Sequence, residues 1–128
     1  MMEMDELYNL LARIRIEAES RIRSELSGLA GIIKAPIYNS FMPLFVNVRS
    51  EKESCHFTFQ KGGAVSLYRG THNNPDLTMS CDHTELKYLL ETRDKNKFQI
   101  DERTGKIKII AHTSKGGKGI GKIREMFA

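Results

Sequence analysis

Residues 75–90, with the sequence PDLTMSCDHTELKYLL, decide how this chain folds. In the first half, the apolar residues Leu77, Met79 and Cys81 alternate with polar ones. That two-residue period is typical of a strand with one buried face. The second half changes to the three- and four-residue steps of a helix. We therefore predict a strand that runs directly into a helix, with both elements facing the same interior.

The junction between the two elements carries its own signal. Asp82 stands three residues before Glu85, which is the spacing of a capping box. We expect the Asp82 carboxylate to accept hydrogen bonds from the first helical turn, and the Glu85 side chain to reach back to it. Leu86, Leu89 and Leu90 then share the apolar face of the helix.

Length and composition indicate one ordinary soluble domain covering residues 1–128. Apolar residues make up 40% of the chain and charged residues 28%, which suits a globular core with a solvated surface. No run of 18 apolar residues occurs, and the acidic N-terminal region lacks the pattern of a signal peptide. Cys55 and Cys81 lie in strand-like stretches and are interpreted as reduced, buried thiols. Together these features predict a cytoplasmic protein.

Charge is distributed unevenly along the chain. Residues 1–92 carry 10 basic and 12 acidic groups, whereas residues 93–128 carry 10 basic and 4 acidic groups, a net charge of +6. A basic segment of this kind attracts phosphates of nucleic acid, of lipid headgroups or of a phosphorylated ligand. The alternative is a solvated surface without a partner.

The N-terminal third predicts a helix and an apolar cover. Residues 3–26 have a helical stripe of apolar side chains, flanked by oppositely charged pairs four residues apart. Residues 27–44 are apolar but interrupted by Gly28, Gly31, Pro36 and Pro43, which argues against one long helix. Two interpretations remain for this segment: a short helix and loop packed on the core, or a mobile cover over an apolar cavity.

Alternating residues predict the strands. They span residues 45–49, 55–60, 65–67, 77–81 and 106–112, and the Gly62-Gly63 turn is a hairpin signal. Short turns, including residues 70–74, predict an antiparallel meander. Residues 98–100 are expected to form an arm of a small hairpin with a turn at 102–105.

The tail, residues 113–121, is expected to be flexible, and residues 120–127 to form a short helix. We expect helices on one face of the sheet, an α+β fold, with this buried sheet face: Phe57, Phe59, Val65, Leu67, Leu77, Met79, Ile107 and Ile109.

The order and spacing of these features resemble the sterol carrier protein type two family over roughly residues 45–127. The resemblance rests on Gly62-Gly63, on residues 75–79, on the helix that Asp82 begins, on residues 105–109 and on the apolar C-terminal helix. It implies a mixed, mostly antiparallel five-stranded sheet with helices on one side and an apolar tunnel between them. It also implies non-covalent binding or transfer of a fatty acid, fatty acyl-CoA, sterol or isoprenoid lipid, without catalysis or cofactor.

The chain departs from that family pattern in three places. Residues 93–104 are longer and more charged than the usual connection, and residues 115–119 (KGGKG) are an insertion. The sequence also closes on MFA, which is no peroxisomal address, so we expect no peroxisomal targeting.

The resemblance and the apolar pattern together give a predicted ligand site. Each of its residues has a simpler interpretation, as core that fills its neighbours' gaps. The expected tunnel lining is Phe57, Phe59, Leu67, Leu77, Met79, Leu86, Leu90, Ile107, Ile123, Met126 and Phe127. The residues expected to contact a phosphate or headgroup are Lys115, Lys118, Lys122 and Arg124.

Other chemistry is poorly supported. Gly116-x-x-x-x-Gly121-Lys122 matches most of a phosphate-binding loop, but Ile123 stands where the loop needs Ser or Thr. The four histidines and two cysteines have no metal-ligand spacing. An inward Cys81 near His83 is more typical of packing than of a nucleophile. We therefore expect neither an enzyme nor a metal site.

Two alternatives to lipid binding stay open. Residues 93–124 are basic enough for a nucleic-acid-binding module, but Phe98 is the only aromatic residue there, and such modules usually interleave aromatic and basic residues. We therefore expect a small hydrophobic ligand and transient membrane contact rather than nucleic acid. The other alternative is a ligand-free interaction domain.

Overall fold

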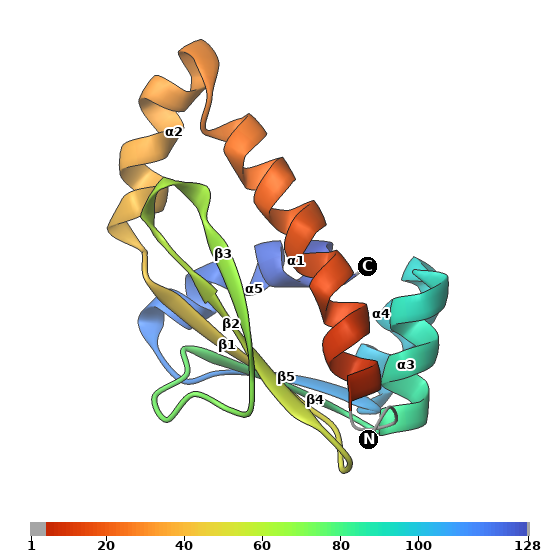
Figure 1. The fold of residues 1–128 in the computed structure, drawn as a ribbon. Helices are drawn as coiled ribbons and strands as arrows, with labels where there is room; N and C mark the ends of the chain where they lie inside the picture. The colour runs from red at the N-terminus through yellow and green to blue at the C-terminus, as the bar shows by residue number, and fades with distance from the viewer. Residues whose placement is uncertain (1–4, 128) are drawn as a thin grey trace.

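The structure, a computed structural model, describes residues 5–127 as one sheet with helices on one side (Figure 1). The elements in chain order are α1 (Glu6–Glu25), α2 (Gly28–Ser40), β1 (Leu44–Arg49), β2 (Ser54–Phe59), the short 3-10 turn η2 (Lys61–Gly63), β3 (Val65–Arg69), β4 (Leu77–Cys81), α3 (His83–Thr92), α4 (Lys95–Thr104), β5 (Ile107–Ala111) and α5 (Ser114–Phe127).

The sheet has the strand order β3-β2-β1-β4-β5. All neighbours are antiparallel except β1 and β4, which are parallel. The α+β class and the mixed five-stranded sheet are therefore confirmed. Leu77, Met79 and Cys81 are buried on the helix side, as their alternation predicted.

The connection from β3 to β4 differs from the predicted meander. The chain crosses the outer face of the sheet after β3 and lays β4 beside β1. His72 holds this crossing in place: its ring stacks on Phe45 at 3.8 Å between centroids, and its backbone N–H donates to Asn47 Oδ1 at 2.8 Å. The five residues 70–74 therefore form a crossover and not a hairpin turn.

The junction at Asp82 forms largely as predicted. The Asp82 carboxylate accepts from the Glu85 backbone N–H at 3.2 Å, and Leu86, Leu89 and Leu90 are buried. The Glu85 side chain does not complete the capping box. It lies 2.7 Å from Lys97 Nζ instead, because α4 brings that ammonium group next to it.

Residues 95–104 form helix α4, so the predicted hairpin arm at 98–100 is wrong. Asp94 caps the helix by accepting from the Lys97 N–H at 3.0 Å, and Gly105 ends it with a φ of 87°. The buried face consists of Phe98 and Asp101, three residues apart. The Phe98–Ile100 alternation was misleading because Ile100 is half exposed at the surface.

Helix α2 departs from the first interpretation of residues 27–44, and the second, a mobile cover over an apolar cavity, stays a prediction. Helix α2 is one continuous helix of 13 residues that runs through Pro36. Gly31 is its only buried residue, and it packs so close to α1 that an added Cβ would lie 2.1 Å from the Leu26 carbonyl oxygen. The helix itself therefore does not pack on the core as expected, because most of its apolar side chains face solvent. The loop after it does, since Met42 packs against the core.

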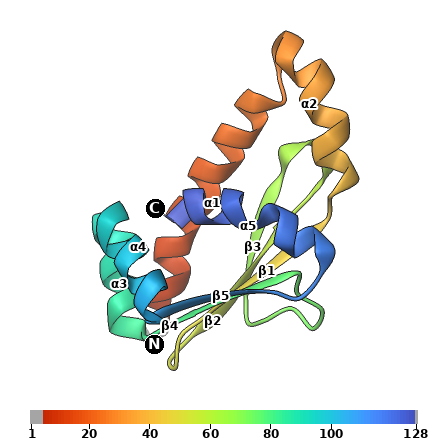
Figure 2. The ribbon, with the colours of Figure 1, turned by 180° about the vertical axis from the view of Figure 1, so that it is seen from behind.

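The C-terminal segment is a single helix, α5, from Ser114 to Phe127, and not a flexible tail followed by a short helix (Figure 2). Thr113 begins it: its hydroxyl accepts from the Gly116 N–H at 3.0 Å and donates to Asp76 Oδ1 at 2.7 Å. Glycine at 116 permits close contact, since an added Cβ would lie 2.0 Å from the Asp76 carbonyl oxygen. Among the glycines that suggested flexibility, Gly116 instead lets the helix approach the sheet.

Asp76 joins this helix to the sheet. Its carboxylate also accepts from the Phe45 N–H at 2.9 Å, and its backbone carbonyl accepts from the His112 N–H at 2.8 Å. The side chain is 4% exposed. The start of β1, the start of β4 and the entry to α5 are thus held at one residue.

Neighbouring glycines in α5 provide a matched test of this packing. We expect Gly116→Ala to destabilise the fold by about 1–3 kcal/mol, because its Cβ collides with backbone. Gly117 has nothing within 4 Å of an added Cβ, so Gly117→Ala should stabilise the helix by roughly 0.5–1 kcal/mol. Urea denaturation of the two variants measures both changes. Equal effects of the two substitutions would contradict the close contact.

Candidate ligand-binding cavity

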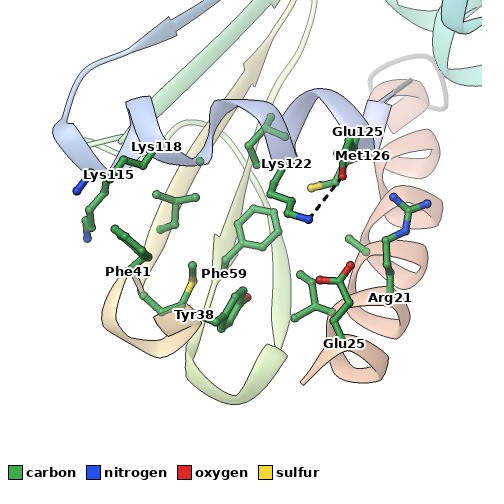
Figure 3. A pocket seen from close by; sticks show the side chains of 16 residues that line it. Arg21, Glu25, Tyr38, Phe41, Phe59, Lys115, Lys118, Lys122, Glu125 and Met126 are labelled. Carbon is green, nitrogen blue, oxygen red and sulfur yellow. Dashed lines mark ion pairs between the residues drawn. The ribbon is translucent and has the colours of Figure 1, made fainter. Parts of the chain in front are cut away.

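An open cavity of about 270 Å³ lies between α1, α5, the end of α2 and the adjoining ends of the first two strands (Figure 3). Most of its wall is carbon, and its charged groups belong to α1 and α5. The lining residues are Ala18, Arg21, Ile22, Glu25, Tyr38, Phe41, Met42, Leu44, Phe59, Lys115, Lys118, Gly119, Lys122, Ile123, Glu125 and Met126.

Helices α1 and α5 form the two long walls, and helical spacing places the lining residues of each helix on one face. On α1, Ala18 and Ile22 are four residues apart and share one face. On α5, Gly119, Ile123 and Met126 follow the same rule. Ala18 and Gly119 have the smallest side chains on their faces, so α1 and α5 leave space where larger residues would fill it.

The sheet and α2 close the remaining sides. Phe59 at the end of β2 and Leu44 at the start of β1 are opposite one another in the sheet register and form the floor. After α2, the chain turns back to the sheet and places Phe41 and Met42 against the cavity.

One polar group of the wall has no protein partner. The Tyr38 hydroxyl oxygen is buried and makes no hydrogen bond among the residues that the structure describes. Burial raises the pKa of Tyr38 to about 12, so the phenol stays neutral and keeps its proton. An unpaired buried hydroxyl is unfavourable, and a hydrogen bond from water or from a polar group of a bound molecule would satisfy it.

Three lysines of α5 stand along the cavity (Figure 3). Lys115 Nζ donates to the Pro43 carbonyl at 2.8 Å, and Lys118 Nζ lies 5.5 Å from the centre of the Phe41 ring. Lys122 is 3.8 Å from Glu125, and both of these side chains are largely exposed. Within residues 5–127, neither Lys115 nor Lys118 has a carboxylate partner. This side of the cavity can therefore attract an anion.

The structure divides the residues predicted to line a tunnel. Three of them, Phe59, Ile123 and Met126, line the cavity, as do three of the four lysine and arginine positions. Arg124 points elsewhere and pairs with Glu102 at 2.7 Å. Leu67 is partly buried and packs against the core. The others lie in the solid core and do not line this cavity: Phe57, Leu77, Met79, Leu86, Leu90, Ile107 and Phe127.

Sequence reasoning missed the α1 part of the wall and named no lining residue in residues 27–44, although a cover over an apolar cavity was one interpretation of that segment. A usable signal was present at Ala18, the one small residue in the apolar stripe of α1. A second was the cluster Tyr38, Phe41 and Met42, which follows the exposed part of α2. Both point to a gap only once α1 and α5 are known to face each other.

Other chemistry finds little support in the geometry. The glycines of the phosphate-loop-like stretch lie inside helix α5, so they form no loop around a phosphate. No three His, Cys, Asp or Glu side chains in the described part of the chain gather closely enough for a metal ion. Cys55 and Cys81 are free, as expected, and burial raises the pKa of each thiol to about 12, which opposes nucleophilic reactivity.

Comparison with solved structures identifies the fold. UbiJ-SCP2, described as a ubiquinone synthesis protein, superposes with a TM-score of 0.51 over 91% of this chain and 97% of its own, at 14% sequence identity. The fold is sterol-carrier-protein-2-like. At 14% identity this similarity concerns the fold alone.

Two further structures are more distant. Sterol carrier protein 2 like 2 from Aedes aegypti has a TM-score of 0.48 and 13% identity, over 94% of each chain. An inverting sec-alkylsulfatase from Pseudomonas sp. matches 61% of this chain but only 12% of the enzyme, at a TM-score of 0.42. No profile of a known protein family and no curated protein sequence matches the chain. No helix among residues 5–127 has the length and apolar character needed to span a membrane.

The Tyr38 environment predicts a late-ionising phenol. Of the four tyrosines, one should titrate near pH 12, and Tyr38→Phe should remove that step from the absorbance of tyrosinate. Because the folded pKa is raised above 10.0, this group's contribution to stability is present below pH 10 and lost as the pH rises toward 12. Four tyrosines that ionise together near pH 10 would contradict the burial of this hydroxyl.

Proposed function

We propose that the protein binds a single-chain amphiphile, such as a fatty acid or fatty acyl ester, non-covalently in the cavity between α1 and α5. The observation that carries this proposal is the combination of an open apolar cavity, a Tyr38 hydroxyl in its wall that has no partner among the described residues, and two lysines beside it, Lys115 and Lys118, that have no carboxylate partner within residues 5–127. In this arrangement the acyl chain lies against Phe59 and Ile123. The polar head lies toward Tyr38 and Lys118. No bond is made or broken.

The size of the cavity favours an acyl chain over a sterol. At about 270 Å³ it lies just below the ~300–1,000 Å³ typical of small-molecule sites. A flexible chain can follow a narrow cavity, whereas a fused-ring ligand needs its full width at once. Each methylene moved from water into the cavity contributes roughly 0.8 kcal/mol, so a partly buried chain suffices for binding after the entropic cost of association.

The charge distribution weakens the nucleic-acid alternative. Several basic residues of the segment 93–124 are already paired within the protein. Arg93 lies 2.6 Å from Glu17, Lys97 lies 2.7 Å from Asp101, and Arg124 pairs with Glu102. Lys115 and Lys118, which have no carboxylate partner within residues 5–127, lie at the apolar cavity, which suits an amphiphile better than a phosphodiester backbone.

Filling the cavity tests the proposal. Ala18→Leu adds a side chain to the α1 wall, whereas Ser20→Leu adds the same side chain at an exposed position of the same helix. We expect Ala18→Leu to weaken binding of hexadecanoic acid roughly tenfold or more, and Ser20→Leu to leave it within about twofold. Native mass spectrometry and displacement of a fluorescent fatty acid measure the affinities. Hexadecanoic acid that binds the two variants equally well would place its site elsewhere.

A second experiment tests the head-group contacts. We expect Lys118→Ala combined with Lys122→Ala to weaken hexadecanoic acid about fivefold while leaving hexadecanol nearly unchanged, because only the acid carries a charge. Lys108→Ala serves as the control, since Lys108 is exposed on β5 away from the cavity lining. Equal loss for the acid and the alcohol would show that the lysines act through packing instead.

A further inference from the structure

Helix α2 presents an apolar face to solvent. Four large side chains on it are 60–86% exposed: Leu29, Ile32, Ile33 and Ile37. Their spacing of three and four residues puts them on one side of the helix, opposite the buried Gly31. Scattered exposed apolar residues are ordinary, but four on one helical face form a patch typical of an interaction site.

The patch begins where α2 projects beyond the sheet. Figures 1 and 2 show the junction of α1 and α2 projecting beyond the strands, while the C-terminal part of α2 lies beside the β2–β3 hairpin. The exposed apolar side chains lie on the other side of the helix from the buried Gly31. The opposite end of the same segment reaches the cavity through Tyr38, Phe41 and Met42. One segment therefore joins an exposed apolar surface to the wall of the proposed ligand site.

The charge on the helix itself has one sign. From Gly28 to Ser40 the helix contains no Asp or Glu, and its only charged residue is Lys34. Lys61 lies in η2, against which α2 packs. The cavity beyond the C-terminal end of α2 adds four basic residues and two acidic ones, Glu25 and Glu125, so the surroundings of the helix are net positive. An apolar strip flanked by cations complements a surface of acyl chains and anionic headgroups.

We propose that α2 docks on an anionic lipid bilayer, with its outward face inserted among the headgroups. Loading of the cavity from that surface rests on the proposed function, whereas docking rests on α2 alone. A second copy of the chain is a poorer partner, because two such helices would bring like charges together. One helical face is also small beside the ~800 Å² per partner of a typical stable interface.

Vesicle flotation tests the docking. The probes are vesicles of phosphatidylcholine alone and of phosphatidylcholine mixed with phosphatidylglycerol. We expect the wild-type protein to float with the mixed vesicles and to be released by added salt. The double variant Ile32→Ser/Ile33→Ser should lower the partition coefficient roughly tenfold or more. Because both residues are exposed, its thermal unfolding should stay close to wild type.

The control is Ile16→Ser/Ile110→Ser, which removes two isoleucines of similar exposure outside α2. It should partition within about twofold of wild type. Flotation that the α2 substitutions leave unchanged would overturn the proposal. The proposal would also be overturned if the wild-type protein sedimented as a dimer and the α2 substitutions converted it to a monomer. A second copy of the chain would then cover this face. Uptake of hexadecanoic acid in vesicle-free solution reports on the ligand site separately, so failure of docking and failure of ligand binding are distinguishable.

Discussion

The buried carboxylate of Asp76 is the contact on which the geometry of the candidate site depends. It binds the Phe45 N–H of β1 and the Thr113 hydroxyl that begins α5, while its own backbone pairs with Phe45 and His112. A buried carboxylate is costly unless its hydrogen bonds are satisfied, so this set of partners is strongly favoured as a unit. Gly116 then lets α5 lie directly on the Asp76 backbone. One wall of the cavity is thereby fixed to the sheet.

The cavity itself follows from small side chains on facing helices. Where α1 carries Leu11 and Ile14, its side chains are fully buried in the core. One turn further along, Ala18 lines the cavity together with Ile123 and Met126 of α5. The same two helices thus form solid core at one place and a binding wall at another. Neighbouring turns of α1 and α5 thus contribute to the stability of the core and to the wall of the cavity.

Local signals in the sequence predicted the local structure well where they agreed with one another. The alternation at Leu77–Cys81 and the cap at Asp82 gave a strand and a helix at the right residues. The glycines of α5 misled, because one of them, Gly116, serves close approach to Asp76, a contact between residues distant in the chain. The site was only partly predictable for the same reason. Burial alone does not distinguish Phe57 in the core from Phe59 at the cavity; that depends on how α1 and α5 meet.

The central claim is that the space beside Ala18 and Ile123 holds an acyl chain. The most direct measurement is isotope-filtered NMR on the protein with hexadecanoic acid carrying a ¹³C-labelled terminal methyl group. The account predicts nuclear Overhauser contacts from that methyl group to Ala18, Phe59 and Ile123. Contacts confined to Leu29 and Ile33 on the outer side of α2, or to Leu77 and Met79 in the core, would contradict it.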